Sequence, residues 1–366
     1  MLNNRKIAVV IPAFNEEKQI SMVLETIPDF VDLVVVVDDC STDKTADIVS
    51  KQINSISKNV TKDNVVSERN ILSTKYSKAE EILHKMNIEE EKYYPSHKIY
   101  SGKSENREII LIINEKNNGV GAAIALGYKF CRDNNIDCTA VMAGDGQMDP
   151  MELESICRPV IENGVDYVKG NRLFHRSAWL VVPKIRYFGN SILSILTKVA
   201  SGYWRVSDTQ CGYTAISLKA LRAIRIHKIY RGYGMPNDLL VKLNVAYCTI
   251  REIEMKPVYD IGETSKMNVL KVAPAITLLL VVNFFKRLWI KYLFRDFHPI
   301  FLLYNFSLFL GIIMLPYTVK IIKLIMHGNQ VSYETLLVFI FLFTSSFQSL
   351  FFAMWMDIQD NERLYK

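Results

Sequence analysis

The sequence lacks the cysteine patterns on which disulfide-rich and secreted proteins depend. Its six cysteines include no C-x-x-C pair and show no regular spacing, which predicts free thiols in a reducing compartment. The apolar run from Met1 to Phe14 is short, contains Pro12 and has no small-residue cleavage site. We therefore interpret this run as a first buried strand rather than a signal peptide.

Strong charge of one sign is also absent. The formal net charge of +6 is modest and spread along the chain, so it does not indicate a nucleic-acid partner. A basic surface that faces anionic lipid headgroups or phosphorylated substrates explains it equally well. The segment Asn117–Ala123 lacks the G-x-G-x-x-G spacing, and no acidic residue follows at the distance that a dinucleotide ribose requires. A Rossmann dehydrogenase is therefore disfavoured, and we expect these glycines to permit a tight turn and close helix packing.

The first half of the chain does contain short runs of β-branched residues that end in polar residues. They occur at Ile7–Ile11, Leu33–Val37, Ile109–Ile113, Thr139–Met142 and Tyr167–Lys169. Such runs are typical of a parallel sheet buried on both faces, in which ligand-binding groups collect at the carboxyl ends of the strands. The predicted fold class is α/β, with one large domain over residues 1–265.

A polar segment interrupts this pattern. Residues 51–107 are rich in Lys, Glu, Asn and Ser and contain one helix-like stretch, Lys78–Glu91. Because the strands on either side fit one sheet, we interpret the segment as an insertion that is mobile or only partly helical.

The last quarter of the chain is mostly apolar. Residues 299–319 and 335–356 carry no charged side chain, and about 20 such residues are enough to cross a bilayer as a helix. We therefore predict a two-helix transmembrane hairpin within residues 297–366. Residues 266–296 mix apolar and basic residues, and we expect amphipathic helices there that lie in the membrane interface. Two buried helices of a soluble protein are the alternative.

Basic residues cluster before the first expected span, at Lys286, Arg287, Lys291 and Arg295. An excess of Lys and Arg marks the cytoplasmic side of a span, so the large domain is expected in the cytoplasm. Lys320 and Lys323 lie on the far side and weaken this assignment, unless they extend the helix or snorkel. An oligomer formed through the hairpins is left open.

Acidic and amide side chains follow the first two expected strands. The first strand continues into P-A-F-N-E-E at residues 12–17, and the second into D-D-C-S-T-D at residues 38–43. Carboxylates at this edge of a sheet can accept hydrogen bonds from a base or ribose, and N–H groups at the next helix start can receive phosphate. Alternatively, Ser41 or Asp43 simply caps the next helix.

The strongest local feature is V-M-A-G-D-G-Q-M-D-P at residues 141–150, a strand that ends in glycine-flanked acidic residues. This turn can present the Asp145 carboxylate and the Gln147 amide oxygen to a hard divalent cation, which would bridge the two phosphates of a nucleotide diphosphate. The alternative is an Asp-Gly turn followed by a helix start at Asp149-Pro150.

Together these segments resemble family 2 glycosyltransferases. Five motifs occur in that family's order: A-F-N-E at 13–16, D-D-x-S-T-D at 38–43, N-G-V-G-A at 118–122, D-G-Q-M-D-P at 145–150 and D-T-Q-C-G-Y at 208–213. They are most similar to the polyisoprenyl-phosphate glycosyltransferase branch, which includes dolichyl-phosphate mannose synthases and bacterial undecaprenyl-phosphate glucosyltransferases. The resemblance covers about residues 5–260 apart from the insertion, and it implies a GT-A fold with inverting chemistry.

The resemblance also implies where the donor and its metal lie. It assigns to the nucleotide Pro12, Ala13, Asn15, Glu16, Asp38, Asp39, Asn118, Gly119 and Asp145. It assigns Mg²⁺ or Mn²⁺ to Asp145 and Gln147. The family's D-x-D motif would have its first Asp where Ala143 stands, so this chain keeps only the second carboxylate. Asp149, or water and phosphate oxygens, would then complete the metal's ligands.

For the acceptor, the resemblance places Arg172 and Arg186 against a lipid phosphate, which a planar guanidinium can bind through two hydrogen bonds. Solvated surface arginines are the alternative. Asp208 matches the family's acidic residue near the sugar, with helix capping as its alternative, and Asp238 could cap the next helix or position the sugar. Because a phosphate acceptor is already anionic, the scattered histidines need not supply a general base. The Q-x-x-R-W motif of processive synthases is absent, which favours a single transfer per encounter.

The resulting prediction is a membrane-anchored enzyme that moves a sugar from a UDP- or GDP-linked donor to a polyisoprenyl phosphate at the cytoplasmic face. The runner-up is a transferase that acts on a growing glycan or glycolipid and uses the hairpin only as an anchor. Arg172, Arg186 and the basic interfacial helices favour the first. A non-catalytic nucleotide-sugar binder that has lost its metal is a third possibility, which Ala143 leaves open.

Overall fold

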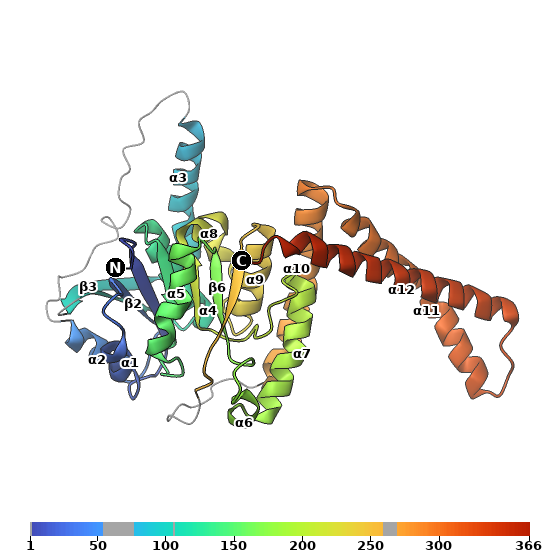
Figure 1. Ribbon diagram of the computed structural model, residues 1–366, viewed down its shortest axis with the longest axis horizontal. Coiled ribbons are helices and arrows are strands. Elements are labelled where there is room, and N and C mark those ends of the chain that lie inside the picture. Colours follow the sequence, from blue (N-terminus) through green and yellow to red (C-terminus); the bar gives the residue numbers. More distant parts are fainter. Residues whose placement is uncertain (1, 54–76, 105–106, 259–268) are drawn as a thin grey trace.

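A mixed sheet of eight strands forms the centre of the computed structural model, which describes residues 2–53, 77–104, 107–258 and 269–366. The strand order is β3-β4-β2-β1-β5-β7-β6-β8 (Figure 1). The strands are β1 (Ile7–Ala13), β2 (Leu33–Asp38), β3 (His97–Ser104), β4 (Arg107–Asn114), β5 (Cys138–Val141), β6 (Tyr167–Asn171), β7 (Thr214–Ser217) and β8 (Ile250–Glu254). All five predicted strands are present, and β3, β7 and β8 are additional.

The strands that carry the predicted motifs run in one direction. β1 pairs in parallel with β2 and β5, and β2 pairs in parallel with β4. β3 and β7 are antiparallel to their neighbours, whereas β8 is parallel to β6. Because β2 and β4 are adjacent in the sheet, the polar segment between them is an excursion from it. The described part of that segment contributes α3 (Lys78–Glu90) and the edge strand β3.

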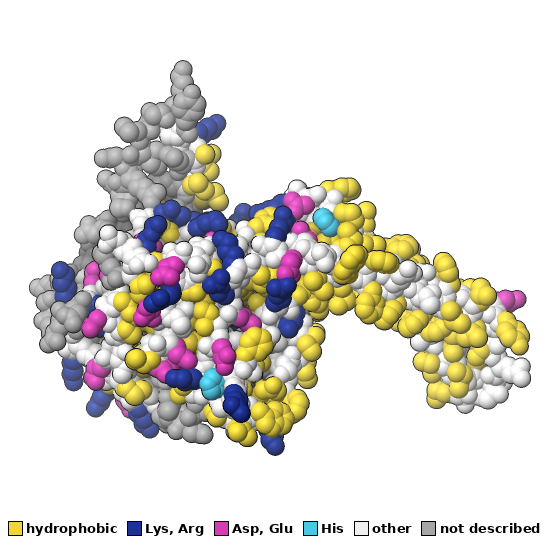
Figure 2. Space-filling view, in the orientation of Figure 1, with side chains coloured by type: hydrophobic (Ala, Val, Ile, Leu, Met, Phe, Trp, Pro, Cys, Tyr) yellow, Lys and Arg dark blue, Asp and Glu magenta, His cyan; other side chains and the backbone are white. Residues whose placement is uncertain are grey.

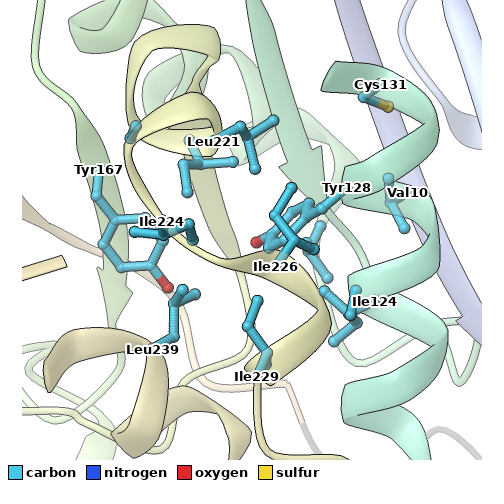
Figure 3. Close-up of a cluster of buried hydrophobic side chains, with 14 of the residues drawn as sticks. Val10, Ile124, Tyr128, Cys131, Tyr167, Leu221, Ile224, Ile226, Ile229 and Leu239 are labelled. Carbon is cyan, nitrogen blue, oxygen red and sulfur yellow. The ribbon is translucent and has the colours of Figure 1, made fainter. Parts of the chain in front are cut away.

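Helices cover both faces of the sheet, and β1 alternates between the two cores. Ala8 and Val10 belong to one buried cluster, and Val9 and Ile11 to the other. The first face is covered by α4 (Val120–Asp133), α8 (Leu218–Ala223) and α9 (Met235–Val245), and the second by α1 (Ile20–Thr26), α2 (Thr45–Gln52) and α5 (Leu153–Glu162). The described residues also form the short 3₁₀ helices η2 (Glu91–Tyr93), η3 (Pro150–Glu152) and η4 (Ile226–Lys228). Figure 3 shows the first core, with Tyr128 and Tyr167 among aliphatic side chains.

Two helices from the middle of the chain and the C-terminal helices lie on one side of this domain (Figure 1). They are α6 (Ala178–Val181), α7 (Lys184–Ser201), α10 (Val269–Arg287), the π-helix η5 (Leu288–Arg295), α11 (Pro299–Met326) and α12 (Tyr333–Glu362). α11 and α12 pack against each other and project away from the sheet (Figure 1). α10 lies beside α7 and α9, where Ile276 and Leu280 are buried against Ala200 and Val241.

Three helical segments in the described part of the chain are long and apolar enough to cross a membrane, judged by length and composition: Val272–Arg295, Pro299–Met326 and Tyr333–Glu362. The two predicted spans lie within the second and third. The helical segment Val272–Arg295 is longer than the sequence suggested, because α10 continues directly into η5. Its most apolar stretch is 28% buried by the rest of the protein, against 6% and 11% for the other two. The interfacial position expected for residues 266–296 stays a prediction.

The approach of α4 to β1 gives a test of the fold. A Cβ added at Gly127 would lie 2.4 Å from Cγ1 of Val10, so Gly127→Ala should destabilise the protein by about 1–3 kcal/mol through overpacking. Gly189, inside α7, has no heavy atom within 4 Å of the same position, and Gly189→Ala should be neutral or stabilising by up to about 1 kcal/mol. Thermal unfolding in detergent measures both, and a Gly127→Ala variant as stable as the wild type would contradict the packing.

Candidate active site

The loops after β1 and β2 are joined to each other by side-chain hydrogen bonds. The N–H of Asn15 donates to Oγ of Ser41 at 2.9 Å, and the N–H of Thr42 donates to Oδ1 of Asn15 at 2.8 Å. Asn15 has a left-handed backbone, with φ at 55°, a conformation that asparagine tolerates better than most residues. The N–H of Glu16 also crosses the gap, donating to Oγ1 of Thr45 at 2.8 Å. Two loops predicted to hold a nucleotide therefore form one surface.

Asp39 organises a third loop on that surface. Its carboxylate accepts hydrogen bonds from Nδ2 of Asn114 at 2.8 Å and from the N–H groups of Asn118 and Gly119 at 3.0 and 2.7 Å. Asp38, beside it, accepts from the N–H and hydroxyl of Ser41, and burial raises its pKa above the usual value. Both carboxylates thus shape the binding loops, and their contact with a nucleotide stays a prediction.

The glycine segment packs as expected. Gly119 has φ at 92°, and a Cβ on Gly121 would lie 2.1 Å from the carbonyl oxygen of Tyr230. The loop that contributes Tyr230 is itself held by Asp238, whose carboxylate accepts the N–H of Tyr230 at 2.8 Å and Nδ2 of Asn283 at 2.8 Å. Asp238 therefore supports the glycine turn, and the described N-cap of α9 is Gly234.

The acidic turn after β5 has the geometry of an Asp-Gly turn followed by a capped helix. Asp145 accepts the N–H of Gln147 at 3.0 Å, and Gly146 has φ at 76°. Asp149 accepts the N–H of Met151 at 2.9 Å and so caps η3. The alternative interpretation is therefore correct for Asp149, and this hydrogen bond does not prevent Asp145 and Gln147 from facing the adjoining cleft.

An open cleft brings several predicted residues together. Its polar lining comes from the acidic turn and from two cationic side chains: Asp145, Gln147, Asp149, Glu152, Arg172 and Lys256. Cys211, Gly212 and Tyr213 form part of the remaining wall. The predicted metal residues thus share a cleft with one of the two predicted phosphate-binding arginines. The side chain of Arg186, in the first turn of α7, lies outside the described structure.

Arg172 is oriented by Asp208. Its Nε and Nη2 donate to the two carboxylate oxygens at 2.9 and 3.2 Å, and its backbone N–H donates to the same group at 3.1 Å. Asp208 has no exposed surface and also accepts the N–H of Cys211 at 3.1 Å, so it closes a turn and caps no helix. Burial would raise the pKa of Asp208, but the adjacent guanidinium outweighs burial and holds that pKa below its usual value.

Sequence reasoning missed Lys256 and Lys169. Lys256 follows β8, its N–H donates to Oε1 of Glu152 at 3.0 Å, and its ammonium lies 3.8 Å from Oδ2 of Asp149. Because β8 does not have the apolar pattern of a buried strand, no signal in the sequence pointed to Lys256. Lys169 is fully buried beneath the cleft, donates to the carbonyl of Cys211, and has its pKa lowered by burial.

No group of three or more His, Cys, Asp or Glu residues in the described part of the chain forms a ready-made metal site. Asp145 and Gln147 supply one carboxylate and one amide oxygen, which are ligands that Mg²⁺ and Mn²⁺ accept. Ala143 contributes none. The residues therefore fit a divalent ion that takes most of its ligands from phosphate and water.

The mixed sheet, the joined loops at its parallel edge and the acidic turn in the cleft define a GT-A glycosyltransferase. Residues 8–64 and 96–225, more than half of the chain, match glycosyl transferase family 2. The chain belongs to this family, and the family predicted from the five motifs is confirmed.

The chain is also similar to individual proteins. The chain is 26% identical over 257 residues to the UDP-N-acetylglucosamine--dolichyl-phosphate N-acetylglucosaminyltransferase of Methanococcus voltae, covering 70% of this chain and 87% of that protein. It is 25% identical to an uncharacterized protein of Methanocaldococcus jannaschii, covering 70% and 84%. Among solved structures, glucosyl-3-phosphoglycerate synthase from Mycobacterium tuberculosis with Mn²⁺, UDP and phosphoglyceric acid has 17% identity and a TM-score of 0.47, covering 78% of each chain.

The Arg172–Asp208 pair predicts an unusual pH dependence. Arg172→Met leaves a buried carboxylate without its partner, which should destabilise the protein by about 3 kcal/mol near neutral pH. In the wild type, the folded pKa of Asp208 lies below the unfolded value, so its stabilisation is lost only as the pH falls through that lowered pKa. In the variant, burial raises the folded pKa, so protonation stabilises the folded state as the pH falls.

The difference in stability between wild type and variant should therefore be largest near pH 7 and shrink toward about pH 4. Thermal unfolding across this range measures it. Arg158→Met is the control, because Arg158 pairs with Glu154 on the surface of α5, and it should leave the profile unchanged. If the loss of stability in Arg172→Met were the same at every pH, the ionised form of Asp208 would not depend on Arg172, and the prediction would be wrong.

Proposed function

We propose that this protein is an inverting glycosyltransferase that moves a sugar from a nucleotide-sugar to a polyisoprenyl phosphate at the cytoplasmic face of a membrane. The observation that carries the proposal is the shared cleft. Its acidic turn suits the diphosphate of a donor, and Arg172 suits the phosphate of an acceptor. The Methanococcus voltae relative, named for UDP-N-acetylglucosamine and dolichyl phosphate, supports both substrate classes and favours a UDP donor.

The donor would lie across the joined loops after β1, β2 and β4, with its diphosphate at the acidic turn. Asp145 and Gln147 would hold a divalent cation there, and the cation would supply charge neutralisation of the leaving diphosphate. Because Ala143 removes one carboxylate of the family motif, we expect the ion to bind with the nucleotide rather than before it.

The acceptor phosphate would approach from the side of Arg172 and Lys256. An oxygen of this phosphate attacks the anomeric carbon as the bond from that carbon to the donor diphosphate breaks, which inverts the configuration. The nucleophile is anionic, so no base has to remove a proton. Arg172 stays aimed at the cleft because Asp208 holds both its Nε and its Nη2.

The apolar surfaces fit a membrane on the side of α7 and α10. Large exposed apolar side chains lie on α6, α7 and η5: Trp179, Leu180, Phe188, Ile192, Ile195, Trp289 and Phe294. Figure 2 shows that hydrophobic surface is continuous along the α11–α12 pair. α7 runs across the direction of that pair (Figure 1). If α11 and α12 cross the bilayer, α7 and α10 therefore lie along its surface, as interfacial helices do.

The decisive experiment supplies membranes that contain the protein with Mg²⁺ or Mn²⁺, a panel of nucleotide-sugars and polyisoprenyl phosphate, and identifies the lipid product by mass. Asp145→Ala and Arg186→Ala should each lower the product by about a hundredfold or more, because Asp145 would hold the cation that neutralises the leaving diphosphate and Arg186 would bind the acceptor phosphate. A chelator should do the same, and Arg158→Ala, on the surface of α5, should not.

The alternatives give different results in the same assay. Transfer to a glycolipid but not to polyisoprenyl phosphate would assign the protein to glycan extension. Nucleotide-sugar binding without transfer or hydrolysis would make it a binder. Full activity of both Asp145→Ala and Arg186→Ala would overturn the metal and acceptor assignments.

A further inference from the structure

The C-terminal end of α12 is joined to the sheet domain by a buried ion pair. Arg287 and Asp357 each have no exposed side-chain surface. Nη1 and Nη2 of Arg287 donate to the two carboxylate oxygens of Asp357 at 2.7 and 2.8 Å, and the hydroxyl of Tyr292 donates to the same carboxylate at 2.6 Å. A charge taken out of water needs such compensation, so the two helices are fixed in one geometry. Arg287 is thus not one of the surface charges that face lipid headgroups.

The same guanidinium holds the last turn of α7. Its Nε donates to the carbonyl oxygen of Ala200 at 3.0 Å, and Nη2 donates to that of Val199 at 3.1 Å. α7 ends at Gly202 with φ at 78°, and a Cβ there would lie 2.5 Å from Nη1 of Arg287. One side chain therefore connects the ends of α7, α10 and α12.

A second buried cation, Lys291, adds to the contacts between these helices. Lys291 donates to Oδ1 of Asn361 at 2.7 Å and to Oδ1 of Asn244 at 3.1 Å, which links η5, α12 and α9. After α12, the N–H of Ile250 in β8 donates to the carbonyl of Leu364 at 2.7 Å. The chain thus returns from the hairpin and pairs with the edge of the sheet.

The middle of α7 contacts the turn that holds Arg172. Ser194 and Thr209 share a hydrogen bond of 3.1 Å between their hydroxyls, and Thr209 follows Asp208 directly. Thr197 on the same helix donates to Oδ1 of Asn237 at 3.0 Å. A continuous set of packed contacts therefore runs from α12 through Arg287 and α7 to the Arg172–Asp208 pair.

We infer that the Arg287–Asp357 pair is a positioning element that sets the orientation of α7 at the membrane surface and, through it, the height of the cleft above the bilayer. An anchor alone needs no buried charges, since an apolar pair of similar volume would hold a helix as firmly. A bidentate fork that also caps α7 fixes direction as well as attachment. Arg287 and Asp357 touch no substrate in this proposal, and their effect on transfer rests on the proposed function.

A spin label on the exposed Ile192 of α7 tests the orientation without any assay of activity. The label is placed by Ile192→Cys on a Cys40→Ser background, because the other five cysteines are buried. Its depth in phosphatidylcholine–phosphatidylglycerol vesicles is measured by collision with oxygen and with a nickel chelate. Asp357→Asn should shift or broaden the depth distribution. Glu362→Gln, which breaks a surface pair with Arg205 at the same end of α12, should not, and an unchanged depth in Asp357→Asn overturns the inference.

Activity gives the second readout. For Asp357→Asn, kcat/KM should fall about tenfold for a long polyisoprenyl phosphate in vesicles but change less than about twofold for a short isoprenyl phosphate in solution. Arg287→Met with Asp357→Leu removes both charges, should fold, and should give the same split. Equal losses on both acceptors would mark a merely structural role and contradict the inference. A wild type that glycosylates neither acceptor would refute the proposed function. The spin label would still test whether the Arg287–Asp357 pair sets the orientation of α7.

Discussion

The site depends on the ion pair between Arg172 and Asp208. A carboxylate with no exposed surface has to be compensated, and Asp208 obtains this from the guanidinium and from the N–H of Cys211. Because its guanidinium is hydrogen-bonded to Asp208, Arg172 is fixed in the wall of the cleft that Asp145 also lines. The pair connects the end of β6 with the turn before β7. The guanidinium of Arg172 is therefore positioned by the part of the sheet where strand direction reverses.

The two halves of the sheet have different tasks. The parallel half ends in loops that carboxylates and amides join into one surface, and Asp39 is the clearest case, since it holds the start of the glycine turn. The mixed half carries Arg172 and Lys256 and leads into α7, which exposes large apolar side chains and packs against α10. A donor and an acceptor would therefore meet where the halves adjoin, and Arg287 joins α12 to the end of α7 on the side of the mixed half.

Much of the fold can be predicted from the sequence, because a strand buried on both faces must be apolar throughout. β8 escapes this rule, since three of the five residues in Ile250–Glu254 are charged. Within the site, Asp145 and Arg172 could be placed at the same sheet edge because each follows a recognisable strand. Partners far apart in the chain could not be foreseen: Asn114 is 75 residues from Asp39, and Arg287 is 70 residues from Asp357. A lone Arg before an apolar stretch indicates a membrane boundary equally well, and only the fold shows that Arg287 is buried.

The central claim is that one divalent metal ion at Asp145 and Gln147 neutralises a diphosphate within reach of Arg172, which binds the phosphate of the acceptor. Anomalous diffraction from crystals soaked with Mn²⁺ and a nucleoside diphosphate tests this most directly. The account predicts one manganese peak beside Asp145 and Gln147, bridging the diphosphate in the cleft that Arg172 lines. A diphosphate bound elsewhere, or an ion outside this turn, would contradict it.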